Sequence, residues 1–234
     1  MTGLMRAALA LAAPLLLWGC VLTPGKFVSS LTINADRTFA FAYKGEVIAI
    51  DPSAAMKGIG ETKPGEGEGE KADAAKPDTE AKAEVDVDAK NREIAAALMK
   101  ESGYKSVVYR GKGKFEIDYA ISGSLTHAFV FPFNVDAQAV FPFVMVEVRQ
   151  GGAVRVRAPG FAGNQSSNAG MSGLDGGSSE SSKYLDGVFT LDTNAEIVSQ
   201  NNEDGARTAG VRKQIVWRAT PLTKDAPAAV LRLK

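Results

Sequence analysis

Residues 114 to 122 alternate apolar and polar side chains, and this period constrains the fold more than any other feature of the sequence. The apolar positions are Phe115, Ile117, Tyr119 and Ile121, and the positions between them are Glu116, Asp118 and Ala120. Because successive side chains of a β-strand point to opposite faces, the apolar set occupies one face. The pattern predicts a strand in an antiparallel sheet that has one buried and one solvated face.

Similar strand-like runs occur along most of the chain. They span residues 31–34, 38–43, 47–50, 105–110, 141–148, 153–157, 188–192, 195–199, 211–218 and 229–233. Gly45 indicates a bulge within one of them. One helix is predicted from about Asp88, because Ile94, Ala97 and Leu98 share a helical face and Gly103 follows as a cap. These elements predict an α+β fold, mostly antiparallel β-sheet with one main helix.

Two segments have compositions that do not support a packed core. Residues 58–88 are rich in Glu, Asp, Lys and Gly and hold no aromatic residue, which predicts a disordered acidic insertion. Residues 163–182 are rich in Gly, Ser and Asn and predict a flexible loop. Residues 27–57 and 89–234 are then expected to form one domain.

The N-terminus carries an export signal. Arg6 precedes an apolar run of residues 7–18, which has the length of a signal-peptide core and is shorter than the roughly 20 residues of a membrane span. The only cysteine of the chain, Cys20, follows directly. We therefore expect residues 1–19 to be a cleaved signal peptide.

Residues Leu17, Trp18, Gly19 and Cys20 resemble the lipobox of bacterial lipoprotein precursors. The resemblance implies cleavage after Gly19 and acylation of Cys20 by diacylglycerol and a third, amide-linked chain such as palmitate. Two or more acyl chains hold a protein stably on a membrane. Residues 20–57 would be the anchor and the first β-hairpin, with 21–26 as a tether. The alternative is an ordinary secretory signal with an incidental cysteine.

Several short segments resemble uncharacterised bacterial lipoproteins, and more distantly the LppM-like lipoprotein domain. They are the lipobox, Lys26-Phe27, the segment from Tyr43 to Glu46, and a closing strand with Ile215 and Trp217. The resemblance covers roughly residues 20–50 and 185–234. It implies a small α+β fold with a lipid-binding cavity, and it carries over no catalytic residue.

Candidate catalytic residues are few. His127 is the only histidine, so a site with two histidine ligands within one chain is excluded, and we expect no metal site and no cofactor. A serine–histidine–acid set could be drawn from Ser124, His127 and Asp118 or Asp136, but no G-x-S-x-G motif supports it. Glu116 and Asp118 lie two residues apart on one strand face. They either act as a pair of catalytic carboxylates or solvate the outer face of the strand. We expect a protein that is not an enzyme.

Five phenylalanines are concentrated around two Phe-Pro-Phe sequences: Phe129, Phe131, Phe133, Phe141 and Phe143. They either fill the core where the sheet curves, or line an apolar pocket or exposed patch for a lipid or a protein partner. The sequence leaves both open.

The function predicted from these features is a lipid-anchored binding or assembly lipoprotein of the cell envelope, with a lipid or another apolar molecule as candidate ligand. The alternative is an envelope hydrolase that uses His127 or Glu116 and Asp118. The formal net charge of zero gives no support for a nucleic-acid partner, and we expect none. In a Gram-negative host Val21 favours the periplasmic side of the outer membrane, and in other hosts we expect the outer face of the plasma membrane.

Overall fold

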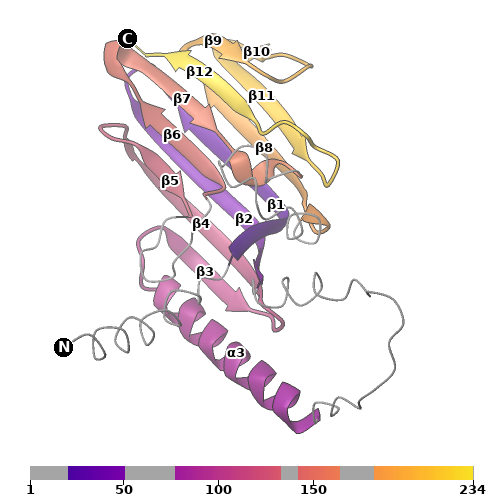
Figure 1. Cartoon of the computed structure of the whole chain (residues 1–234). Helices are drawn as coiled ribbons and strands as arrows, with labels where there is room; N and C mark the ends of the chain where they lie inside the picture. The colour runs from indigo at the N-terminus through magenta and orange to yellow at the C-terminus, as the bar shows by residue number, and fades with distance from the viewer. Residues whose placement is uncertain (1–20, 51–76, 133–141, 164–181, 234) are drawn as a thin grey trace, which may run out of the picture.

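A computed structural model describes residues 21–50, 77–132, 142–163 and 182–233. Most of the described chain is in two β-sheets, with a single long helix beside them (Figure 1). The larger sheet has seven strands in the order β10-β11-β8-β1-β2-β4-β3, and the smaller has five in the order β5-β6-β7-β12-β9. The predicted α+β class, mostly antiparallel with one main helix, is confirmed.

The larger sheet is built around β1 (Val21–Ile33) and β2 (Thr38–Ile50), which form a long antiparallel hairpin. The strands that complete it are β3 (Tyr104–Tyr109), β4 (Lys114–Ser124), β8 (Asp186–Thr193), β10 (Arg207–Ala209) and β11 (Arg212–Ala219). β1 pairs with β8 in parallel, and the other pairings in this sheet are antiparallel.

The smaller sheet consists of β5 (Phe129–Phe131), β6 (Val144–Val148), β7 (Ala153–Arg157), β12 (Ala228–Arg232) and β9 (Glu196–Gln200). All of its pairings are antiparallel. Two short 3₁₀ helices adjoin it, Gln150–Gly152 between β6 and β7 and Pro159–Phe161 after β7. The β6–β7 register shows a hairpin across residues 150–152, between strands that correspond to the predicted runs 141–148 and 153–157.

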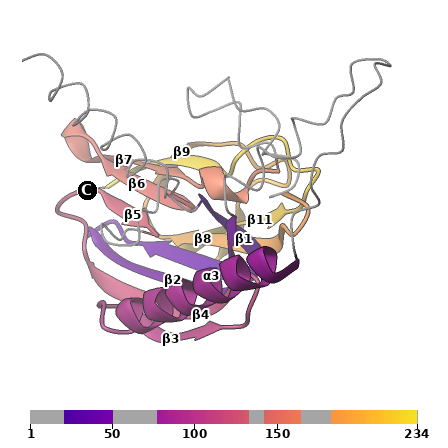
Figure 2. The same ribbon diagram turned by 60° about the horizontal axis from the view of Figure 1, so that its bottom comes forward.

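The two sheets pack face to face and bury one common core (Figure 2). On β4 the predicted alternation is observed, because Phe115, Ile117 and Tyr119 are buried whereas Glu116 is exposed. The corresponding residues of β1 and β2, such as Leu31 and Phe41, lie on the same inner face. Burial of this face against the smaller sheet is the main stabilisation of the fold.

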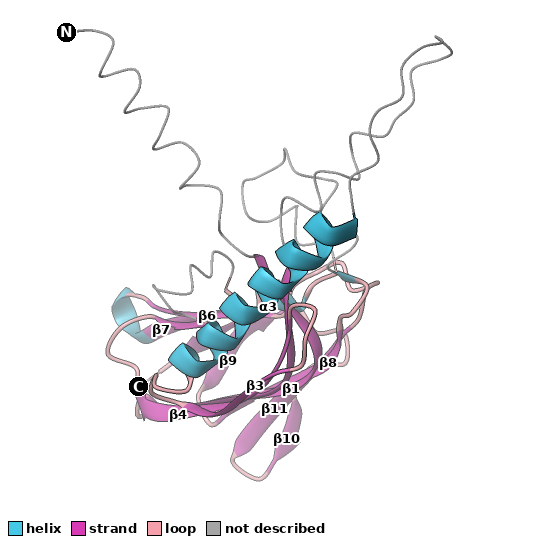
Figure 3. Cartoon of the chain, turned by 90° about the horizontal axis from the view of Figure 1, so that it is seen from below, coloured by secondary structure: helices cyan, strands magenta, loops and turns pink. Residues whose placement is uncertain are grey.

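Helix α3 (Pro77–Leu98) packs against β3 on the inner side of the larger sheet, beside the smaller sheet (Figure 3). Its buried side chains include Asn91, Ala95 and Leu98. Gly103 follows the helix with φ +97°, and a Cβ there would lie 2.5 Å from the ring of Tyr119. Glycine is therefore required both by the backbone conformation and by the close approach.

Two expectations differ from the structure. The helix begins at Pro77 rather than near Asp88, so it includes the last part of the segment that was expected to be disordered. Residues 21–26 were expected to be a tether, but they form the start of β1 and pair with β2. Residues 1–20, 51–76, 133–141 and 164–181 lie outside the described residues, and with them the predicted signal peptide, most of the acidic insertion and the Gly/Ser loop.

A bulge separates the first residues of β1 from the rest of the strand. Pro24 is opposite Val47 and Phe27 is opposite Gly45, so Gly25 and Lys26 together face Glu46. A Cβ on Gly45 would lie 2.5 Å from the Cα of Phe27, which only glycine avoids. A bulge was predicted at Gly45 of β2; the irregularity lies beside Gly45, but the extra residue belongs to β1, at Gly25 and Lys26.

Candidate functional site

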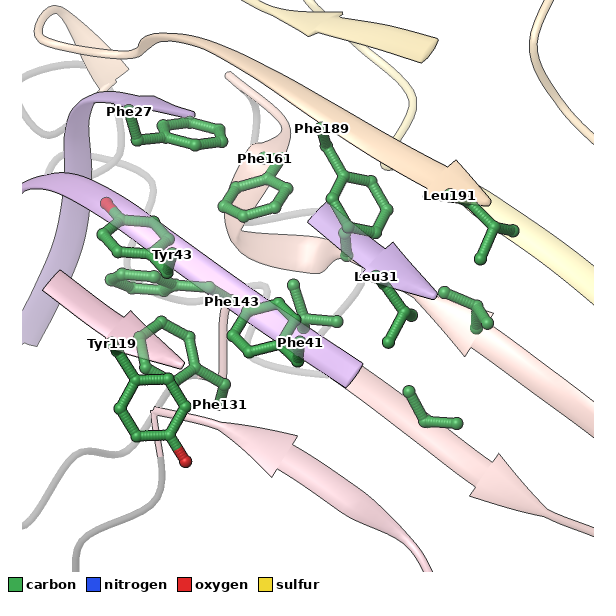
Figure 4. Packing of buried hydrophobic residues seen from close by; sticks show 14 of the residues in the cluster. Phe27, Leu31, Phe41, Tyr43, Tyr119, Phe131, Phe143, Phe161, Phe189 and Leu191 are labelled. Carbon is green, nitrogen blue, oxygen red and sulfur yellow. The ribbon is translucent and has the colours of Figure 1, made fainter. Parts of the chain in front are cut away.

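Of the five phenylalanines in the predicted Phe-Pro-Phe cluster, three are described. Phe131 at the end of β5 and Phe143 just before β6 are each 1% exposed, and Phe129 is half-buried. Phe133 and Phe141 lie outside the described residues. Phe131 and Phe143 thus belong to the core rather than to an exposed patch, because β5 and β6 turn their rings toward the larger sheet (Figure 4).

Phe131 lies among rings from both sheets. Its centroid is 4.7 Å from that of Tyr119, 5.0 Å from that of Phe41 and 5.2 Å from that of Tyr43. Phe143 continues the group at 6.1 Å from Phe131. These are the separations at which tilted aromatic pairs attract each other beyond the burial of their area.

The rings extend across the interior as a continuous row, which we call the aromatic row. In order along the interior it consists of Tyr104, Tyr119, Phe131, Phe143, Phe161, Phe189 and Trp217, with successive centroids 4.8, 4.7, 6.1, 6.4, 5.4 and 5.6 Å apart. The row runs from β3 at one edge of the larger sheet to β11 near the other. It is the most distinctive feature of the interior, and its rings form a packed core because they contact one another directly.

Phe27 joins the aromatic row from β1. Its ring stacks on Phe161 at 4.2 Å and on Tyr43 at 5.5 Å. Gly187 of β8 is opposite Phe27, and a Cβ there would lie 2.3 Å from the Phe27 ring. The absence of a side chain at this position therefore creates the space that the Phe27 ring occupies.

The phenol groups in and beside the aromatic row are held neutral. Burial, with a smaller contribution from the charge of Glu46, raises the pKa of Tyr43 well above its usual value. Its hydroxyl donates to the backbone carbonyl oxygen of Glu46 at 2.8 Å. Burial likewise raises the pKa of Tyr104 and of Tyr119. Burial therefore keeps these phenols uncharged in the interior.

The candidate catalytic residues lie apart from this interior. His127 is exposed in the loop between β4 and β5, and its Nδ1 is 2.9 Å from the hydroxyl of Thr126. Glu116 forms an ion pair with Arg110, and Asp118 lies 3.9 Å from the Lys44 ammonium. Both carboxylates are on the outer face of the larger sheet, where such pairs keep the surface solvated. Asp136 lies outside the described residues.

One polar side chain that the sequence did not single out connects the two sheets. The Oδ1 of Asn201, just after β9, accepts from the Trp217 indole at 3.2 Å and from the Ala228 backbone N–H at 2.9 Å. Its Nδ2 donates to the Ala226 carbonyl oxygen at 2.8 Å. Asn201 therefore fixes Trp217, the last ring of the aromatic row, to the β12 end of the smaller sheet. In the sequence Asn201 looks like an ordinary turn residue, so no local signal reveals this role.

Within the described ranges, His, Cys, Asp and Glu side chains form no group of three or more that could hold a metal ion. Nor does any helix in the described part of the chain have the length and apolar character needed to cross a membrane.

Comparison with protein-family models and with curated proteins gave no match. Four chains among the solved structures match, and one of them is the NMR structure of the folded domain of Mycobacterium tuberculosis LppM. The identity is 16%, the match covers 92% of each chain, and the TM-score is 0.35. At this identity and TM-score the match assigns no function to the chain.

Proposed function

We propose that this protein is a lipoprotein of the bacterial cell envelope, held on a membrane by acyl chains on Cys20, with a binding or assembly role. The proposal rests on the lipobox-like Leu17 to Cys20, which follow the apolar run of residues 7–18. The described residues begin at Val21. Cleavage before Cys20 would therefore remove the export signal and leave every described element intact.

A comparison of the wild-type protein with Cys20→Ser tests this proposal. Cells are fed an alkyne-bearing fatty acid, and membrane and soluble fractions are separated after a high-salt wash. We expect labelled wild-type protein in the membrane fraction, released by detergent alone, because two or more acyl chains anchor stably. Cys20→Ser should be unlabelled, and its signal sequence should remain uncleaved or be cut elsewhere.

Ser30→Ala is the matched control, because Ser30 is an exposed residue of β1, the first strand after Cys20. It should behave as the wild type. Wild-type protein that carries no label, or whose mature N-terminus lies ahead of Cys20, would contradict the proposal. The membrane that receives the protein depends on the host envelope, and density-gradient separation of inner and outer membranes identifies it.

An apolar ligand is the finer part of the proposal. The aromatic row and its neutral phenols support a lipid or another uncharged apolar molecule. The test is to extract purified Cys20→Ser protein, without its signal sequence, with organic solvent and to analyse the extract by mass spectrometry. A bound lipid in near-stoichiometric amount is expected. An empty extract together with no uptake of a fluorescent fatty acid would remove the ligand and leave the anchor proposal unaffected.

A further inference from the structure

The described fold leaves no free chain between Cys20 and the sheet. Val21 is already paired with Ile50 of β2, and Leu22 is paired with Ala49. Consecutive Cα atoms across a trans peptide are about 3.8 Å apart, so Cys20 lies within one residue length of this pair. If Cys20 carries acyl chains, the end of the β1–β2 hairpin must lie at the surface of the bilayer.

The side chains at this end of the hairpin are apolar. Leu22, Ile48, Ala49 and Ile50 follow one another in the paired strands, and each is half-buried. Toward the middle of the same sheet the outer face carries polar residues such as Glu46 and Lys44. The outward-facing positions of β2 therefore change from Lys44 and Glu46 to Ile48, so partly accessible apolar side chains lie beside the anchor.

A turn that carries a basic side chain lies next to this apolar end. The β3–β4 turn contacts β2 through a hydrogen bond from the Ala49 N–H to the Gly113 carbonyl oxygen at 2.8 Å. Lys112 in the turn is exposed. The flanking cations Arg110 and Lys114 are paired with Glu116 and Glu46, and Lys112 adds a further positive charge to the turn. A cation beside partly accessible apolar side chains matches the phosphate and glycerol layer of a phospholipid surface.

We propose that this end of the molecule, formed by Leu22, Ile48, Ile50 and the Lys112 turn, rests in the headgroup layer of the bilayer and fixes the orientation of the domain on the membrane. The inference depends on the proposed acylation of Cys20. The orientation is a further claim beyond the acylation, because an anchored domain on a flexible tether would have no fixed orientation.

Fluorescence quenching measures which end faces the lipid. A thiol-reactive fluorophore is placed at Lys112→Cys in the full acylated protein, in phosphatidylcholine vesicles that contain phosphatidylglycerol and a headgroup-spin-labelled lipid. Val211→Cys is the matched control, because Val211 is 86% exposed and precedes β11, which begins beside the β8 end opposite the anchor. At about 3.3 Å per residue, the length of β1 places Val211 roughly 40 Å from the anchor end of the hairpin.

We expect strong quenching at position 112 and almost none at position 211. A third variant inserts about ten Gly and Ser residues between Cys20 and Val21, a segment whose mean span is roughly 18 Å. This insertion should abolish most of the quenching at position 112. Equal quenching at the two positions, or no change on insertion, would overturn the proposed orientation.

Failure of the anchor itself has a separate signature. An acylated Cys20 sulfur is a thioether and cannot react with the fluorophore, so wild-type protein should remain unlabelled. Labelling of the wild type would show a free Cys20 and would contradict the acylation. An unlabelled, vesicle-bound wild type with an unquenched probe at position 112 would contradict only the orientation.

Discussion

The hydroxyl of Tyr109 on β3 donates a hydrogen bond to the carboxylate of Asp88 on α3. The same oxygen accepts from the Asn91 side-chain amide at 3.2 Å and from the Gly113 backbone N–H at 2.9 Å. A phenol has one donor and two acceptor positions, so this hydroxyl is fully used. One side chain thereby joins the helix, the edge strand and the β3–β4 turn.

Tyr109→Phe should destabilise the protein by about 1–3 kcal/mol, because it leaves three polar groups without their partner. Hydrogen exchange should become faster in α3 before it does in β1 or β2. Urea unfolding followed by circular dichroism gives the free energy. Tyr184→Phe is the control, since Tyr184 is 55% exposed, and it should change stability by less than about 0.5 kcal/mol. If the two substitutions changed the stability equally, this would contradict the role of Tyr109 in joining the helix, the edge strand and the β3–β4 turn.

Phe131→Ala should cost about 3–5 kcal/mol in unfolding free energy, because it opens a cavity among the rings of Phe41, Tyr43 and Tyr119. If this variant does not fold, Phe131→Leu retains most of the apolar volume and should cost roughly 1–2 kcal/mol. Val211→Ala, at an exposed position, serves as the control and should be nearly neutral. A near-neutral Phe131→Leu and a folded, equally stable Phe131→Ala would show that the site is not packed as described.

Stability should fall at alkaline pH. The pKa values of Tyr43, Tyr104 and Tyr119 are raised by burial in the folded state, so the unfolded chain loses these protons first. The contribution of these protonated phenols to the free energy of unfolding is complete below the unfolded pKa of about 10. It decreases as the pH rises above that value. At pH values between its unfolded and its folded pKa, a phenol adds a slope of at most about −1.4 kcal/mol per pH unit.

The measurement is urea unfolding at several pH values between 8 and 11, for the wild type and for Tyr43→Phe. The variant lacks one titrating group and should show a shallower decrease above pH 10, whatever its stability at pH 8. Parallel slopes for the two proteins would contradict the burial of the Tyr43 phenol.

Asn201→Ala should destabilise the protein by about 1–2 kcal/mol, because the Trp217 indole and the Ala228 N–H lose their acceptor. The tryptophan emission should shift to longer wavelength as the ring becomes more mobile and more hydrated. Ser199→Ala, exposed on the neighbouring β9, is the control and should alter neither stability nor emission. Unchanged emission from Asn201→Ala would mean that the hydrogen bond does not hold the ring.

Elements whose signal is local were predictable from the sequence. The alternation around Ile117 and Tyr119 predicted β4, and the strand-like runs at 141–148 and 153–157 predicted the pair β6 and β7. The start of α3 was missed because its charged composition resembles that of disordered segments. Pro77 at the first helical position, with Asp78 and Glu80 following it, is nevertheless a favourable helix start.

Features that depend on distant partners could not be predicted. Pro24 and Gly25 looked like part of a tether, yet both are buried in β1. Pro24 is tolerated because pairing with β8 begins only at Lys26, so no N–H is needed on that side. Within the aromatic row, Phe161 and Phe189 come from separate segments, and no short stretch of sequence places them beside Phe143.

The parallel pairing of β1 with β8 has a consequence for biogenesis. Residues 26–33 find one neighbour almost at once in β2, but their other neighbour, residues 186–193, is about 160 positions later. Closing so long a loop is slow and entropically costly, so the central strand stays half-completed until most of the polypeptide has emerged. The topology therefore makes completion of the central strand β1 a late step of folding.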